Sequence, residues 1–144
     1  MHLSIPLLLL ILTVVNSDPD ADQESKRLMI LLKNSIDLKQ IEALKAFTDP
    51  KFEWDTCKKV LDYRQYMEML RTKAAAETVN THWSVINVRQ KSRDLLYFTI
   101  HTNGPKSAYY PDWHFEAKRN IEMKNKFVLT RGKLDKCGKL DERS

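Results

Sequence analysis

Two acidic residues, Glu53 and Asp55, have the spacing that acid–base chemistry could use. They stand two positions apart in residues 52–55, where apolar and acidic residues alternate as they do in a half-buried strand. Paired carboxylates divide the acid and base roles when burial separates their pKa values. The alternation, however, places both side chains on the face opposite Phe52 and Trp54. Solvated acidic residues are therefore expected, and no catalytic residue is predicted.

Three histidines, His82, His101 and His114, fall on or beside different segments of the second half of the chain. A metal site built from them would require these segments to converge, because the sequence has no His-x-His or His-Glu-x-x-His spacing. His101 and His114 alternate with apolar neighbours and are expected to face away from the core. The sequence therefore predicts scattered surface histidines, no metal site and no cofactor.

Residues 1–17 have the features of a secretory signal peptide. The run from Ile5 to Val15 contains no Asp, Glu, Lys or Arg, and small residues near Ser17 predict cleavage after that position. The run is shorter than the roughly 20 residues that span a bilayer, and no later stretch is apolar enough to do so. We expect a secreted chain without a membrane span. An uncleaved anchor is the less favoured alternative, since positive flanking residues are missing.

The two cysteines, Cys57 and Cys137, both follow this leader. Thiols in an oxidising compartment usually pair, and neither cysteine has a second thiol or histidine at metal-binding or redox-active spacing. We therefore predict one disulfide between them. The closed loop would stabilise the fold by up to about 4 kcal/mol.

The charge of the chain is unevenly distributed. All 24 basic and 19 acidic residues follow the leader and give a net charge of +5. Residues 18–57 contain 9 acidic and 6 basic groups, whereas residues 58–144 contain 10 acidic and 18 basic groups. A basic face attracts anionic surfaces, although a solvated lysine-rich exterior is the commoner cause of such a balance. No nucleic-acid-binding motif is present, so nucleic acid is not predicted as a partner.

The first half of the chain after the leader has helical spacing. Residues 25–35 predict a first helix, preceded at 18–24 by an acidic lead-in that does not pack. Cap-like spacings at 37–40 and 62–65 predict the starts of two further helices, which end near residues 47 and 76. A short strand at 52–55 separates these two helices.

The second half of the chain has the spacing of strands. After Val79, β-branched and aromatic residues recur with period two. This order of elements predicts an α+β fold class, with N-terminal helices packed on one face of a curved, mostly antiparallel sheet. One domain is expected at residues 25–138, followed by a charged tail at 139–144. The strands are predicted at Trp83–Arg89, Leu95–Thr102, Trp113–Ala117 and Phe127–Leu134.

A string of features along the chain carries a family resemblance. In order, these are Asp37 at the start of a short helix, Leu44-Lys45-Ala46-Phe47, Asp49-Pro50-Lys51-Phe52-Glu53-Trp54, Cys57, a helix around Tyr66 to Leu70, long strands, and Cys137. The arrangement resembles the nuclear transport factor 2-like superfamily, specifically its small secreted nematode-type single-domain proteins. The resemblance implies a cystatin-like, or cone, fold whose open end holds a pocket. That scaffold hosts ketosteroid isomerases, dehydratases and plain binding modules, so the fold alone does not select an activity.

The resemblance also implies what to look for inside the cone. Enzymatic members of the superfamily use a carboxylate base with tyrosine or protonated aspartate donors, or an Asp–His pair, and no such constellation matches this sequence. We therefore expect a non-enzymatic domain that binds a small apolar ligand or a protein. The alternative is a cone-fold isomerase or dehydratase with an unidentified acid–base residue. Candidate pocket residues are Tyr66, Phe98, Trp113 and Phe115, although core packing explains such aromatics more often. A homodimer through the exposed sheet face is a further expectation.

Overall fold

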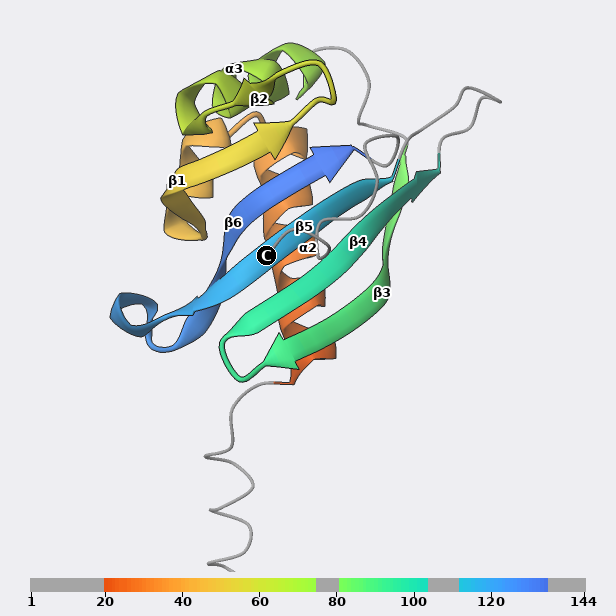
Figure 1. The fold of residues 1–144 in the computed structure, drawn as a ribbon. Coiled ribbons are helices and arrows are strands. Elements are labelled where there is room, and N and C mark those ends of the chain that lie inside the picture. The colour runs from red at the N-terminus through yellow and green to blue at the C-terminus, as the bar shows by residue number, and fades with distance from the viewer. Residues whose placement is uncertain (1–19, 75–80, 104–111, 135–144) are drawn as a thin grey trace, which may run out of the picture.

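The computed structural model describes residues 20–74, 81–103 and 112–134. The predicted leader, Cys137 and the charged tail lie outside these ranges. None of the described helices is both long and apolar enough to cross a bilayer. In chain order, the elements are α2 (Ala21–Asp37), the 3-10 helix η1 (Ile41–Ala46), β1 (Thr48–Asp55), β2 (Val60–Leu61), α3 (Tyr63–Ala74), β3 (His82–Ser92), β4 (Leu95–Asn103), β5 (Trp113–Asn120), the 3-10 turn η2 (Ile121–Met123) and β6 (Lys126–Leu134) (Figure 1).

Helix α2 begins within the acidic segment that precedes the predicted helix. Oδ1 of Asp20 accepts a hydrogen bond from the backbone N of Gln23 at 2.8 Å, which caps the helix N-terminus. The expectation that residues 18–24 do not pack is wrong for the described part of that segment, since Glu24 is only 3% exposed. The helix packs against the core through an apolar face formed by Leu28, Leu32 and Ile36.

One of the two predicted capping pairs is present. Asp62 and Gln65 bond reciprocally at the start of α3: Gln65 N donates to Asp62 Oδ1 at 2.9 Å, and Asp62 N donates to Gln65 Oε1 at 3.0 Å. Asp37 instead forms an ion pair with Lys33 within α2. The next helix starts after Gln40 without a side-chain cap. The predicted second helix is thus a 3-10 helix rather than a capped α-helix.

A six-stranded sheet forms the second layer, in the order β2-β1-β6-β5-β4-β3. Neighbouring strands run antiparallel except β1 and β6, which are parallel. The prediction did not include the parallel pair or the short β2. Strand β1 starts at Thr48, so Pro50 lies within it, where the pairing with β6 is irregular between Thr48 and Glu53. Proline lacks a backbone N–H and is tolerated in sheets at such irregular places.

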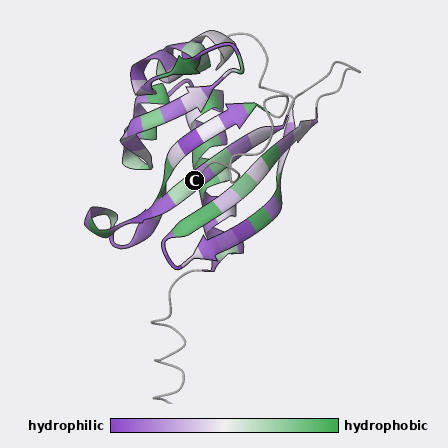
Figure 2. Cartoon of the chain, in the orientation of Figure 1, coloured by the Kyte–Doolittle hydropathy of each residue, from purple (hydrophilic) through white to green (hydrophobic). Residues whose placement is uncertain are grey.

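The helices cover one face of this sheet. Helix α2 crosses behind the strands, and α3 lies over the β1 end (Figure 1). Apolar and polar residues alternate along the strands (Figure 2), so one face meets the helices and the other faces away. Register shifts at Ile86/Arg89 in β3 and Glu116/Ala117 in β5 mark β-bulges, which bend a sheet. The predicted α+β class, with helices on a curved and mostly antiparallel sheet, is confirmed.

Candidate functional site

Aromatic side chains pack between the helices and the sheet. The ring centroid of Trp54 lies 5.2 Å from that of Tyr66, 5.7 Å from that of Trp113 and 5.6 Å from that of Phe115. Phe98 stacks on Phe115 at 5.6 Å. The structure thus brings the four predicted pocket residues together around Trp54, and each of them is buried in the core. Rings in mutual contact are typical of a packed interior. Two of the four, Phe98 and Phe115, also line the cavity between β3, β4 and β5 that is described below. That any of the four contacts a ligand stays a prediction.

Gly132 on β6 allows Trp54 to lie close to the sheet backbone. It pairs with Trp54 on β1 and with Phe115 on β5. A Cβ at this position would stand 2.5 Å from Cε3 and from Cζ3 of Trp54. Ordinary contact between carbon atoms is about 3.5–4.0 Å. The absence of a side chain at Gly132 therefore provides the space that the indole ring occupies.

The hydroxyl of Tyr66 is a polar group inside this aromatic core. The residue is 0% exposed, and its hydroxyl has no hydrogen-bond partner in the described part of the chain. Burial raises the pKa of Tyr66 far above its usual value, because the interior solvates a phenolate poorly. Tyr66 therefore stays protonated and is a hydrogen-bond donor rather than a base.

The opposite face of the sheet carries a buried polar network around Glu116. Oε2 of Glu116 accepts hydrogen bonds from Nε and Nη2 of Arg131 at 3.1 and 2.6 Å, and Oε1 accepts one from Oγ1 of Thr130 at 2.8 Å. The Tyr97 hydroxyl donates to Oε2 at 3.3 Å. Tyr97, Glu116 and Arg131 are register neighbours on β4, β5 and β6, so the sheet itself aligns them.

This network keeps Glu116 ionised. Burial on its own would raise the pKa of Glu116, but hydrogen bonds from Arg131 and Thr130 and the charges of Arg131 and Lys118 outweigh it and lower the pKa from its ordinary 4.5. The hydrogen bond to Glu116 in turn raises the pKa of Arg131. A carboxylate with a lowered pKa is a poor general base, since base catalysis near neutral pH works best with a pKa close to that pH.

A cavity of about 390 Å³ opens beside this network, where β3 departs from regular pairing. Asn87 has a φ of 53°, a left-handed conformation that asparagine tolerates, and lies in the β3 bulge. Arg89 lies over the Tyr97 ring at 5.5 Å. Oγ1 of Thr99 is 2.8 Å from Nδ1 of His114. Strand alternation places Tyr97, Thr99 and His114 on the face turned away from α2. The lining residues are Asn87, Val88, Arg89, Tyr97, Phe98, Thr99, His114 and Phe115.

The other groups considered for chemistry do not gather into one site, although His101 pairs with Asp112. Glu53 is exposed and Asp55 is half-buried, both on the face opposite the core, as the alternation predicts. His82 is exposed, and Nδ1 of His101 lies 2.6 Å from Oδ1 of Asp112. Within residues 20–74, 81–103 and 112–134, no group of three or more His, Cys, Asp or Glu side chains is placed to hold a metal ion.

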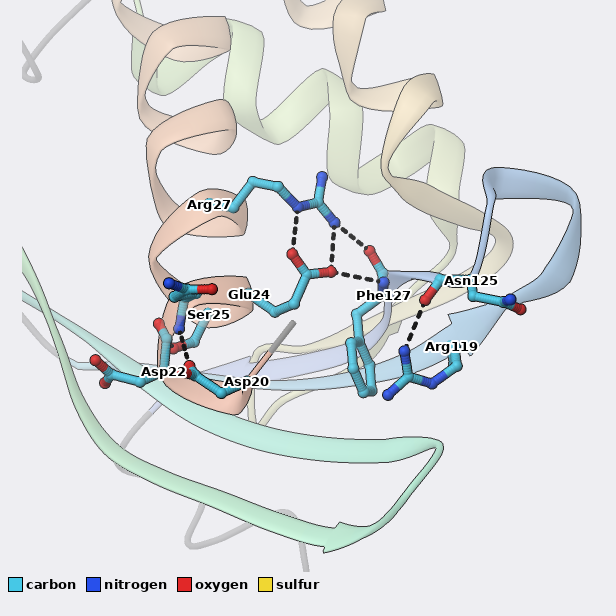
Figure 3. Close-up of polar contacts among 9 residues, drawn as sticks. Asp20, Asp22, Glu24, Ser25, Arg27, Arg119, Asn125 and Phe127 are labelled. Atoms are coloured by element: carbon cyan, nitrogen blue, oxygen red, sulfur yellow. Dashed lines mark hydrogen bonds and ion pairs between the residues drawn. The ribbon is translucent and has the colours of Figure 1, made fainter. Parts of the chain in front are cut away.

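Another buried carboxylate, Glu24, holds α2 against β6 (Figure 3). It accepts hydrogen bonds from Nε and Nη2 of Arg27 at 2.7 and 3.2 Å and from the backbone N of Phe127 at 3.0 Å. Arg27 also donates to the Phe127 carbonyl at 2.8 Å. Burial acts to raise the pKa of Glu24, but the bonds from Arg27 and Phe127 and the charges of Arg27 and Lys126 lower it. These contacts give Glu24 a structural role.

The outer-face residues Tyr97, Glu116 and Arg131 were not predicted as a group. The alternation of strands 95–102 and 113–117 does place Tyr97 and Glu116 opposite their core neighbours. It does not say which residues on adjacent strands stand side by side, because that depends on strand register and bulges. The alternation with the core residues Phe115 and Ala117 indicates only that Glu116 faces outward, and no pattern within strand 113–117 indicates that it is buried there.

These features define a class of protein: a small α+β domain in which helices and a curved sheet enclose an aromatic core, with a cavity of mixed polar and apolar lining between β3, β4 and β5. Residues 22–139 match the family model of the NTF2-like domain. The chain belongs to this family, as the superfamily resemblance predicts.

Several solved structures share the fold. A putative ketosteroid isomerase from Shewanella frigidimarina superposes with a TM-score of 0.60 at 8% identity, covering 79% of this chain and 96% of that chain. An NTF-2-like protein of unknown function from Silicibacter pomeroyi gives 0.60 at 12% identity, covering 78% and 92%. Another from Pseudomonas aeruginosa gives 0.59 at 14% identity, covering 78% and 94%. Similarity at these identities shows the fold alone. No curated protein matches the chain.

Proposed function

We propose that this chain is a secreted, non-enzymatic NTF2-like domain that binds a small amphipathic molecule in the cavity between β3, β4 and β5. The observation that carries the proposal is the cavity itself. Its volume, about 390 Å³, falls within the roughly 300–1,000 Å³ of small-molecule sites. The lining combines the Tyr97 ring with the polar side chains of Asn87, Thr99 and His114. A ligand with both apolar and polar surface fits this lining better than a purely apolar one.

The buried carboxylates support a binding role over a catalytic one. Glu24 and Glu116 are 3% and 4% exposed, and each is bound by an arginine that lowers its pKa. An isomerase or dehydratase base would need the opposite environment, in which burial without a cation raises the pKa toward neutrality. Both glutamates therefore stabilise the fold and hold charge without exchanging protons near neutral pH.

The enzyme alternative has two observations in its favour. One is the half-buried pair of His101 and Asp112, whose Nδ1 and Oδ1 atoms lie 2.6 Å apart, and the other is the buried hydroxyl of Tyr66. A protonated tyrosine inside a cone could donate a hydrogen bond to a substrate oxygen. Isomerase and dehydratase assays on the wild-type chain test this alternative. Turnover that Tyr66→Phe abolishes, while the fold is retained, would replace the binding proposal.

Secretion and the Cys57–Cys137 disulfide are part of the same proposal, as is the likeness to nematode-type secreted single-domain proteins. The register of the parallel strands supports the disulfide, because Asp55 on β1 pairs with Lys133 on β6. In the sequence, Cys57 follows Asp55 by two positions and Cys137 follows Lys133 by four, so the proposed bridge would link the segments that follow two paired parallel strands.

Native mass spectrometry of the chain purified from its secretory source tests the ligand proposal. A retained small molecule is expected on the wild type, and its loss is expected in Thr99→Phe, which fills the cavity. Ser84→Phe is the matched control. Ser84 on β3 pairs with His101, two residues from Thr99 on β4, and so lies on the same face of the sheet but outside the cavity lining. Equal retention by Thr99→Phe and Ser84→Phe would refute this location, provided that both variants melt cooperatively.

A further inference from the structure

The turn between β5 and β6 carries apolar side chains in the open. Ile121 is 85% exposed and Met123 is 39% exposed. Figure 1 shows this turn projecting beyond the neighbouring strands, and Figure 2 shows its apolar colour between hydrophilic stretches. Turn residues are usually polar, glycine or proline, so two large apolar side chains on one protruding turn are unusual.

The backbone holds this turn in a defined shape. Oδ1 of Asn120 accepts a hydrogen bond from Met123 N at 3.3 Å. Lys124 N donates to the Ile121 carbonyl at 3.2 Å, and Asn125 N donates to the Asn120 carbonyl at 3.0 Å. Lys124 and Asn125 adopt φ values of 58° and 62°, which complete the reversal. The apolar side chains are therefore presented to solvent by an ordered turn.

Exposed lysines flank the two apolar side chains. Residues 118–126 contain four basic residues and one acidic residue: Lys118, Lys124 and Lys126 are exposed, the side chain of Arg119 is largely buried in an ion pair with Asp94, and Glu122 is exposed between Ile121 and Met123. The adjoining turn at 91–94 adds two basic residues and one acidic residue. Arg119 joins the two turns, since its backbone N donates to the Asp94 carbonyl at 3.0 Å. It also donates to the Asn125 carbonyl at 2.8 Å (Figure 3).

We propose that this apolar-tipped basic turn, residues 118–126, docks the domain on an anionic phospholipid surface. Ile121 and Met123 would enter the boundary between headgroups and acyl chains, while the lysines meet the lipid phosphates and carboxylates. A protruding apolar tip flanked by exposed lysines is the combination that gives interfacial binding both its hydrophobic and its electrostatic parts. The site is separate from the β3–β4–β5 cavity, so this inference goes beyond the proposed function.

Co-sedimentation of the full chain with phosphatidylcholine vesicles, with and without phosphatidylserine, tests the proposal. Binding is expected with phosphatidylserine and should weaken as salt rises. Ile121→Ser with Met123→Ser should weaken it by about tenfold or more, and Lys124→Gln by about fivefold. Leu38→Ser is the matched control and should bind as wild type. Leu38 is 64% exposed at the C-terminus of α2, whereas the turn adjoins the N-terminal part of that helix, where Glu24 bonds to Phe127.

Three results would overturn the proposal. The first is wild-type chain that stays in the supernatant with phosphatidylserine vesicles at low salt. The second is an Ile121→Ser/Met123→Ser variant that sediments as well as wild type. The third is a Lys124→Gln variant that loses retention on heparin but binds vesicles as well as wild type does. That result would identify a soluble polyanion as the partner instead.

Discussion

Replacing Gly132 by alanine is expected to destabilise the domain, although alanine normally suits a strand better than glycine does. The new Cβ would lie 2.5 Å from two ring carbons of Trp54 and 3.1 Å from Cδ1 of Phe115. Restoring ordinary contact requires the indole to move by about 1 Å. Trp54 is 1% exposed and touches Tyr66, so it has little space to move into. Overpacking of this kind costs about 1–3 kcal/mol.

Urea unfolding followed by tryptophan fluorescence and circular dichroism measures this cost. The midpoint should fall in Gly132→Ala, and the melting temperature should drop by about 2–8 °C for each kcal/mol lost. Lys91→Ala, on an exposed strand position, is the control and should change stability by less than about 0.5 kcal/mol.

The double variant Gly132→Ala/Trp54→Phe separates steric conflict from other causes. The smaller phenyl ring removes the conflict. The double variant should therefore lose less free energy of unfolding than the two single variants lose in sum, by about 0.5–3 kcal/mol. Strict additivity, or a Gly132→Ala protein as stable as wild type, would refute the conclusion that the indole fills this space.

Three further predictions concern the N-terminus of α2, the buried carboxylates and the cysteines. Asp20→Ala should lower stability by about 1 kcal/mol in urea unfolding, because it removes the cap of α2. The pKa values of Glu24 and Glu116 are lower in the folded chain than in the unfolded chain, so the unfolded chain binds protons first on acidification. The stabilisation from these two groups should be complete above about pH 4.5, the ordinary value, and should be lost as the pH falls below it. Thermal melts across this range should show the loss, and the melting temperature should fall less steeply with pH in Glu24→Gln. Non-reducing peptide mapping should recover Cys57 and Cys137 in one linked fragment, and free thiols at both positions in secreted material would contradict the disulfide.

The sequence predicts those parts of the fold that depend on local spacing. The reciprocal cap of Asp62 and Gln65 and the alternation through β4 and β5 are examples, because neighbours along the chain determine both. The parallel pairing of β1 with β6 is different, since it joins residues such as Trp54 and Gly132 that are far apart in the sequence. The early start of α2 depends on Glu24 and its bonds to Phe127, which are equally remote.

The candidate site was harder to predict than the fold. The cavity depends on a bulge at Asn87, and the polar network depends on Glu116 standing beside Tyr97 and Arg131. Both depend on the register between neighbouring strands, which the alternation within one strand does not specify. The aromatic residues were predicted in the right layer, but whether they enclose space or fill it depends on three-dimensional packing.

Strand β3 lies at one border of the sheet, where a ladder of backbone N–H and C=O groups would otherwise be open to a strand from another molecule. The kink at Asn87 interrupts the regular spacing of that ladder, and Arg89, Lys91 and Arg93 add repulsion between like copies. We therefore expect this border to oppose strand-to-strand association of copies at high concentration. Deleting Asn87 would straighten the border and is expected to shorten the lag before thioflavin-positive aggregates form.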